Sequence, residues 1–174
     1  MQDANGNGLP DDVWYELRGS EYDTDNYSRG YAITYYRPSA AGMGVQWRDN
    51  RGSTGTIRRN TTHTQEYYYP AWEQSTFTLH GSLLQPNTDV DAATGNQVNR
   101  AYAWGYADNQ GSDTGSTGEA VKNYFKISSA MAADGTAAEL QYIDFVKVQS
   151  AINHVAGALG EISTEVLAIR DENM

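Results

Sequence analysis

Apolar and polar residues alternate in several short stretches of the chain, and such alternation is typical of half-buried β-strands. The clearest stretch is 75–84, where Phe77 and Leu79 fall on one face while Thr78 and His80 fall on the other. Side chains of a strand point to opposite faces in turn. This stretch therefore predicts a strand with one face on a core and the other in solvent.

Further strands are predicted where β-branched and aromatic residues cluster between turn residues. The expected strands are 13–17, 31–36, 45–47, 125–131, 142–149 and 164–169. The stretch 142–149 is apolar on both faces, as in a central strand. Pro70 argues against a central strand in 67–72, because proline cannot donate a ladder hydrogen bond.

Polar runs rich in Gly, Asp, Asn and Ser separate these strands and predict turns and loops. They are 3–12, 49–52, 86–101 and 108–118, while 151–159 permits a short helical turn. The sequence shows neither strand–helix alternation nor a Gly-rich phosphate loop. Many short strands with polar turns predict an all-β fold, a β-sandwich or jelly-roll-like, with short helical turns and a single domain over 1–174.

Charge and composition narrow the possible functions. The chain has 22 Asp and Glu residues against 12 Lys and Arg residues, for a net charge of -10, which argues against a nucleic-acid partner. It contains 0 cysteines, which excludes disulfides, Cys-based zinc sites and thiol nucleophiles. No stretch approaches about 18 consecutive apolar residues, so no transmembrane segment is expected. An acidic polar surface suits a secreted protein and offers oxygen ligands to hard cations.

The first residues carry no targeting signal, because Met1 leads directly into a polar loop. We therefore expect either a cytoplasmic protein or an exported one whose signal is not part of this sequence.

The loop 3–12 has the alternation of a calcium-binding loop. Oxygen-bearing side chains recur at every second position, and Gly8 falls where such loops need a sharp turn. The expected ligands are the side chains of Asp3, Asn5, Asn7, Asp11 and Asp12 and the carbonyl group of Leu9. Calcium takes six to eight oxygen ligands in a flexible arrangement, and this loop supplies five or six.

Trp14 occupies the position at which an EF-hand has its bidentate Glu, so the EF-hand interpretation fails and a shorter structural loop is favoured. Asp12, Glu16, Asp144 or Glu161 are candidates to complete the shell. A weak shell predicts a low affinity, with Kd on the order of 10⁻⁴ to 10⁻³ M. The alternative is a turn held by side-chain-to-backbone hydrogen bonds without any metal.

A set of aromatic residues in or beside turns provides candidate ligand contacts. Exposed Tyr and Trp side chains suit flat amphipathic ligands such as sugar rings, because they offer apolar area with a polar group. The candidates are Trp47, Tyr67, Tyr68, Tyr69, Trp72 and Trp104, with Tyr106 beside the last. The alternative is that these side chains fill the core and the bases of loops.

Enzyme chemistry has little support in the sequence. The histidines His63, His80 and His154 are isolated, and no nucleophile-elbow motif is present. Two carboxylates could be paired as in a glycoside hydrolase, for example among Asp144, Glu161 and Glu165. A structural role for these acids is the favoured interpretation.

Several segments that extend along nearly the whole chain are distinctive in combination: 3–17, 19–22, 33–38, 69–72, 104–108, 143–149 and 160–166. Together they resemble an uncharacterised family of cell-surface, PKD-domain-type lipoproteins from gut Bacteroidetes. In similar proteins the Asp/Asn loop follows several strands. The resemblance therefore implies that this chain corresponds to the C-terminal portion of the sandwich, lacks its N-terminal strands and has an exposed sheet edge.

In that family, genes often lie near outer-membrane transporters, including some for corrinoid uptake. The resemblance thus implies a calcium-stabilised, non-catalytic module that captures a glycan or another nutrient, including a corrinoid, at the bacterial outer surface, together with an outer-membrane transporter. The alternatives are a glycan-active hydrolase and a structural or adhesion domain of a larger surface protein.

Overall fold

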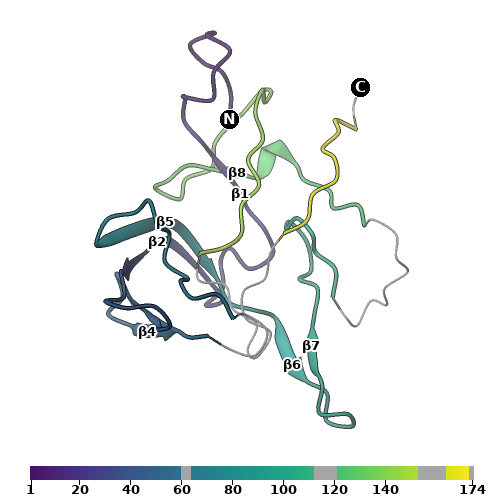
Figure 1. The fold of residues 1–174 in the computed structure, drawn as a ribbon. Helices are drawn as coiled ribbons and strands as arrows, with labels where there is room; N and C mark the ends of the chain where they lie inside the picture. Colours follow the sequence, from purple (N-terminus) through teal and green to yellow (C-terminus); the bar gives the residue numbers. More distant parts are fainter. Residues whose placement is uncertain (60–63, 112–120, 153–163, 173–174) are drawn as a thin grey trace. The chain divides into compact units, whose positions relative to one another are not determined.

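Short β-strands make up the regular structure of the chain, apart from one 3₁₀ turn in the described residues (Figure 1). The computed structural model describes residues 1–59, 64–111, 121–152 and 164–172. These residues fall into two compact units. One contains Met1–Tyr27, Gln85–Ser150 and 164–172, and the other contains Ser28–Leu84 with 151–152.

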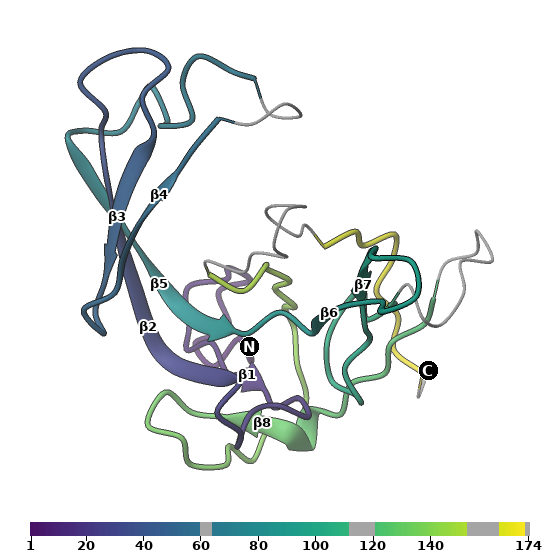
Figure 2. The same cartoon turned by 90° about the horizontal axis from the view of Figure 1, so that it is seen from below.

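The second unit is built on a four-stranded sheet with strand order β4-β3-β2-β5 (Figure 2). Its strands are β2 (Tyr27–Tyr36), β3 (Val45–Asp49), β4 (Thr54–Ile57) and β5 (Thr76–Leu84). β3 pairs antiparallel with β2 on one side and with β4 on the other. β5 contains the alternating stretch of the sequence, so that predicted strand is confirmed, but Leu79 on its predicted core face is 44% exposed.

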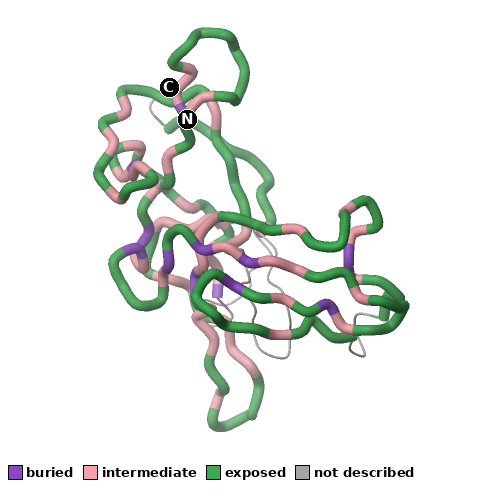
Figure 3. The backbone as a smooth tube through the Cα atoms, turned by 90° about the vertical axis from the view of Figure 1, so that its left-hand side faces the viewer, coloured by how far each residue is buried: buried purple, intermediate pink, exposed green. Residues whose placement is uncertain are grey.

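The core of the second unit lies on one face of β2. Tyr31 and Ile33 alternate along that strand and are the largest fully buried side chains in the described residues. Val45 of β3 and Leu84 of β5 are buried as well. Tyr35 stacks on Phe77, with ring centroids 5.1 Å apart. Buried positions are sparse along the rest of the backbone (Figure 3).

The first unit holds two small antiparallel ladders. β1 (Glu16–Leu17) pairs with β8 (Ala130–Met131), which follows the 3₁₀ turn η2 (Ile127–Ser129). β6 (Thr88–Val90) pairs with β7 (Gln97–Asn99). The amides of Asp144 and Phe145 donate to the carbonyl of Met1, at 3.1 and 3.3 Å, and this holds the start of the chain against the segment that follows β8.

Three predicted strands are wrong in type or length. Only Glu16–Leu17 of 13–17 is strand, and 125–131 forms η2 followed by the short β8. The segment 142–149 is not a strand, and Val146 in it is 48% exposed. Apolar composition suggested a central strand there, but the described residues place no strand alongside it to complete a ladder.

The last predicted strand, 164–169, is also wrong, since it has no regular structure and Leu167 is 85% exposed. Conversely, the predicted loop 86–101 contains the hairpin of β6 and β7. Three-residue strands are too short to show alternation in the sequence. The carboxylate of Asp91 forms the turn between them by accepting from the amides of Ala93 and Thr94.

The predicted fold class is confirmed. The described residues form several antiparallel sheets, as a β-sandwich-type all-β fold requires, with only a short helical turn. Within the described ranges, no helix has the length and apolar character needed to cross a bilayer. Predictions for 151–159 and most of 108–118 concern positions largely outside the described residues.

Candidate functional site

The N-terminal loop brings its predicted oxygen donors together. The Asp3 carboxylate accepts from the amides of Asn7 at 3.1 Å and Gly8 at 2.8 Å. Gly6 and Gly8 have φ of 70° and 73°, a conformation that favours glycine and lets the chain turn back on itself. Asp12 accepts from the amide of Ala4 at 2.9 Å and so closes the loop from its far end.

The two asparagines of the loop point their amide groups toward one carboxylate. The side-chain nitrogens of Asn5 and Asn7 donate to Asp11 at 3.2 and 3.0 Å. Their oxygens accept from the amides two residues ahead, Asn7 and Leu9, at 2.9 and 2.8 Å. Hydrogen bonds thus link Asn5, Asn7 and Asp11, with the asparagine nitrogens rather than their oxygens facing the carboxylate.

Asp144 is the residue from outside the loop that the structure adds to it. Its carboxylate accepts from the amide of Asp3 at 2.8 Å, so it lies at the first position of the loop. It was one of the candidates to complete the shell. Glu16 instead accepts from the Tyr27 hydroxyl, and Glu161 lies outside the described residues.

The donor set fits a hard cation in composition, and the loop also forms the hydrogen bonds of a metal-free turn. Carboxylate and amide oxygens retain further lone pairs after accepting one amide hydrogen, so the two roles are compatible. In the described part of the chain, no three His, Cys, Asp or Glu side chains gather as a metal-binding group. A calcium shell here would therefore need amide and carbonyl oxygens in addition to carboxylates.

The predicted aromatic contacts divide between the two units. Trp47, Tyr67, Tyr68, Tyr69 and Trp72 belong to the second unit and Trp104 to the first. Trp72 and Tyr67 are exposed, at 84% and 59%, and so offer ring faces to a ligand. Trp47 is half-buried over Gly55, its cross-strand partner, and Tyr68 is also half-buried.

Tyr69 is a core residue, and its prediction as a ligand contact is wrong. It is 4% exposed, its ring packs edge-on against Phe77 at 5.3 Å, and its hydroxyl donates to the carbonyl of Gln74 at 2.8 Å. The guanidinium of Arg37 lies 4.6 Å from the ring centroid. These contacts and its burial leave no free ring face for a ligand.

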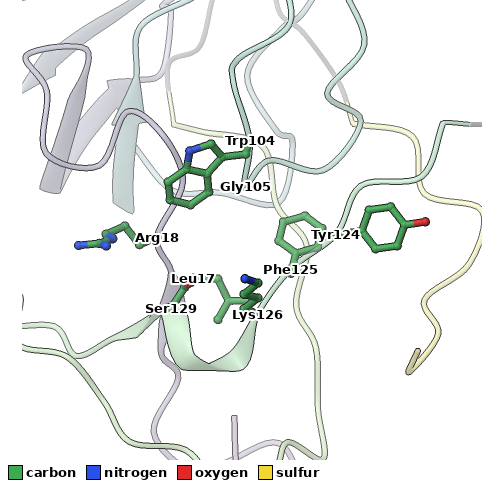
Figure 4. A pocket seen from close by; sticks show the side chains of 8 residues that line it. All are labelled: Leu17, Arg18, Trp104, Gly105, Tyr124, Phe125, Lys126 and Ser129. Carbon is green, nitrogen blue, oxygen red and sulfur yellow. The ribbon is translucent and has the colours of Figure 1, made fainter. Parts of the chain in front are cut away.

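Trp104 lines a pocket of about 330 Å³ in the first unit (Figure 4). Its neighbours come from three parts of the chain that sequence reasoning did not connect: Leu17 and Arg18 after the loop, Gly105, and Tyr124, Phe125, Lys126 and Ser129 before β8. The run Tyr124–Phe125–Lys126 combines flat apolar side chains with a cation. That combination was the available signal, but 125–131 was predicted only as a strand, and Tyr124 lay outside it.

Tyr102 and Tyr106 flank Trp104 in the sequence, and their ring centroids lie 4.8 Å apart. Burial raises the pKa of each phenol to about 12. The Tyr106 hydroxyl accepts from the amide of Glu21 at 3.1 Å, and the Tyr102 hydroxyl donates to the carbonyl of Gln85 at 2.6 Å. These two phenols therefore stay protonated at neutral pH and hydrogen-bond to the backbone of the first unit.

Hydrogen bonds hold several carboxyl groups in their ionised form. Asn26 and Ser20 donate to Glu21 and lower the pKa of that carboxyl below its usual value. Backbone and side-chain hydrogen bonds from Thr94 lower the pKa of Asp91 in the same way. A general acid needs the opposite shift, so neither group has the property of a catalytic proton donor.

The isolated groups considered for catalysis do not form a site in the described residues. Asp144 is exposed and bonded to the loop, and His80 is exposed on β5. The amide of Glu165 donates to Asp108 at 3.0 Å. His63, His154 and Glu161 lie outside the described residues.

Comparison of the chain with protein-family models and with curated proteins gave no match, so its candidate functions rest on the residues described above.

Proposed function

We propose that this domain is a non-catalytic binding module, stabilised by Ca²⁺ at its N-terminal loop, that captures a glycan or another nutrient ligand at the outer surface of a bacterium. The single observation that carries the proposal is that side chains with oxygen atoms able to bind a metal ion lie close together in the N-terminal loop. Asp3, Asn5, Asn7 and Asp11 converge there, and Asp144 joins them from a distant part of the chain.

Two features of the loop support a cation. Carboxylate and amide oxygens are the ligands that calcium prefers, and an acidic protein attracts cations to such a loop. The loop also connects distant segments, since the backbone amide of Asp3 donates to the carboxylate of Asp144 at 2.8 Å. A cation bound here would therefore stabilise the first unit as well as the loop itself.

Exposed aromatic residues support ligand capture. Trp72, Tyr67 and Trp104 expose 84%, 59% and 49% of their surface, although burying such side chains is favourable. Exposed aromatic rings are a common means of binding sugars and other flat ligands. The location at a bacterial surface, with a transporter as partner, follows from the family resemblance and from the acidic composition.

Thermal unfolding in EDTA and in calcium tests the metal half of the proposal. Ligand binding to the native state alone raises the free energy of unfolding by about 2.7 kcal/mol when the ligand is at a hundredfold excess over Kd. We expect 10 mM CaCl₂ to raise the melting temperature of the wild type over its value in EDTA. Asp11→Asn should lose most of that rise, because it removes a carboxylate while keeping the shape of the loop.

Asp25→Ala is the matched control, because Asp25 is an exposed acid outside the loop. It should keep the full calcium-dependent rise. Comparing the rise within each variant removes any effect of the substitution on the metal-free fold. An equal melting temperature in EDTA and calcium for the wild type would reduce the loop to a metal-free turn and remove the calcium half of the proposal.

A further inference from the structure

The pocket beside Trp104 has walls that the backbone holds in place. The Arg18 amide donates to the carbonyl of Ser129 at 2.9 Å, and the Ser20 amide donates to the carbonyl of Trp104 at 3.0 Å. The segment after β1 is thus bonded on one side to η2 and on the other to the loop that carries the tryptophan. The pocket is therefore part of the folded framework of the first unit.

A close contact between two glycines sets the position of the tryptophan. Gly105 has φ of 86°, and a Cβ atom built on it would lie 2.5 Å from the Cα of Gly19. A Cβ atom on Gly19 would in turn lie 2.5 Å from the ring of Tyr106. The backbone of Gly105, which lines the pocket of about 330 Å³, is therefore packed directly against Gly19.

The walls offer flat apolar surface to solvent. Trp104, Phe125 and Tyr124 expose 49%, 45% and 67% of their surface. Three half-exposed aromatic side chains beside one pocket form an apolar patch of the kind that marks ligand sites in soluble proteins. One large side chain exposed alone would carry no such meaning.

Positive charge is the second property of the pocket. Arg18 and Lys126 both line it, in a chain whose net charge is -10. Arg18 is paired with Asp23 at 3.5 Å, and in Figure 4 its guanidinium points away from the aromatic side chains. Lys126 lies among Leu17, Phe125 and Trp104, and it takes part in no ion pair within the described residues. Lys126 is therefore the cation that faces a ligand there.

We propose that this pocket binds a sugar ring that bears a single carboxylate, a hexuronate unit, through stacking on Trp104 and Phe125 and an ion pair with Lys126. The inference rests on the proposed function as a binding module and names the chemical class of its ligand. The apolar face of a pyranose suits an aromatic ring, and the carboxylate suits the ammonium group. A polyanionic chain would be repelled by the remaining surface, so the inference concerns isolated uronate units.

The test compares two probes that differ only in the carboxylate: methyl β-D-glucuronide and methyl β-D-glucoside. Binding is followed by tryptophan fluorescence and by ligand-observed NMR at low ionic strength. An exposed ion pair predicts roughly two- to fivefold tighter binding of the glucuronide. This preference should disappear at about 1 M salt, where the Debye length falls to about 3 Å.

Lys126→Gln should bind the two probes equally. Lys122→Gln is the matched control, because it removes the same charge from the same segment without lining the pocket. It should keep the preference. Trp104→Ala should lose binding of both probes, whereas Trp72→Ala, in the second unit, should keep it. Unchanged thermal unfolding of Lys126→Gln would confirm that its effect concerns binding alone.

Three results would overturn the inference: binding of neither probe, equal binding of both to the wild type, or loss of binding in Trp72→Ala but not in Trp104→Ala. The third leaves the proposed binding function intact and moves the ligand to the second unit. Failure of the proposed calcium binding would be recognised separately. The melting temperature would be the same in EDTA and in calcium, while the protein would still bind the glucuronide more tightly than the glucoside.

Discussion

Asp49 shows how a single polar side chain can organise a turn. Partial burial alone would raise its pKa, but hydrogen bonds from the amides of Ser53 and Arg51 and from the Tyr31 hydroxyl outweigh burial and lower it. The distances are 2.7, 2.9 and 3.1 Å. One carboxylate thus fixes the β3–β4 turn and gives a partner to a tyrosine that is 1% exposed.

We therefore expect Asp49→Ala to lower the free energy of unfolding by about 2 kcal/mol, because two turn amides and a buried hydroxyl lose their acceptor. Asp49→Asn should cost less, since its amide oxygen can still accept from the turn. Urea denaturation measures both. Asp25→Ala, at an exposed acid, is the control, and an equal effect of Asp25→Ala and Asp49→Ala would contradict this account.

Residue-level patterns predicted the N-terminal loop well and the pocket poorly. The loop is local, so the spacing of Asp3, Asn5 and Asn7 is enough to bring their side chains together. The pocket joins Leu17, Trp104 and Phe125, which lie far apart in the sequence. The pairing of β1 with β8 and the hydrogen bond from the Ser20 amide to the Trp104 carbonyl bring them together, and two-residue strands leave no pattern to predict that pairing.

Among the elements, strand prediction succeeded where alternation was long and failed where composition stood alone. β5 has 9 residues, the first five of which alternate between polar and apolar, and it was found with nearly correct bounds. The apolar segment 142–149 has the composition of a central strand, but a strand also needs partners for its backbone groups. Whether such partners exist is a tertiary property, so composition could not decide it.

The contact between Gly19 and Gly105 gives a test at the level of elements. Gly105→Ala adds a methyl group 2.5 Å from the Cα of Gly19, in a backbone conformation that already disfavours a side chain. Gly95→Ala has a similar φ of 71° but meets nothing within 4 Å, so it measures the conformational cost alone.

We expect Gly95→Ala to destabilise the protein by about 1 kcal/mol and Gly105→Ala by clearly more, as chemical denaturation would show. Equal losses would mean that the segments carrying Gly19 and Gly105 separate without cost. The contact would then not fix the position of Gly105 in the pocket wall.

For the whole molecule, the titrating groups set a pH range of stability. Glu21, Asp49 and Asp91 have pKa values lowered by hydrogen bonds, from ordinary values of 4.5, 3.8 and 3.8. Their contribution is present above those values and is lost as the pH falls through the lower folded pKa values. Tyr102 and Tyr106 have raised pKa values of about 12, so their contribution is present below pH 10 and is lost as the pH rises toward 12.

Urea midpoints measured from pH 3 to pH 12 should therefore fall at both ends, with a plateau between about pH 5 and pH 9. The double variant Tyr102→Phe/Tyr106→Phe should flatten the alkaline fall while it leaves the acid fall unchanged. It should also lower the plateau, because both hydroxyls make hydrogen bonds. If the urea midpoint of this variant fell as steeply at alkaline pH as that of the wild type, other groups would be responsible for the loss of stability.

The pairing of β1 with β8 also has a consequence for the order in which the protein is made. Glu16 pairs with Met131, so the first unit needs residues that lie far apart in the sequence, whereas the sheet of the second unit is continuous from Tyr27 to Leu84. Synthesis proceeds at about 5–20 residues per second, so Glu16 waits roughly 6–23 s for its partner. Asp3 therefore leaves the ribosome well before Asp144, and their hydrogen bond forms only after Asp144 has followed.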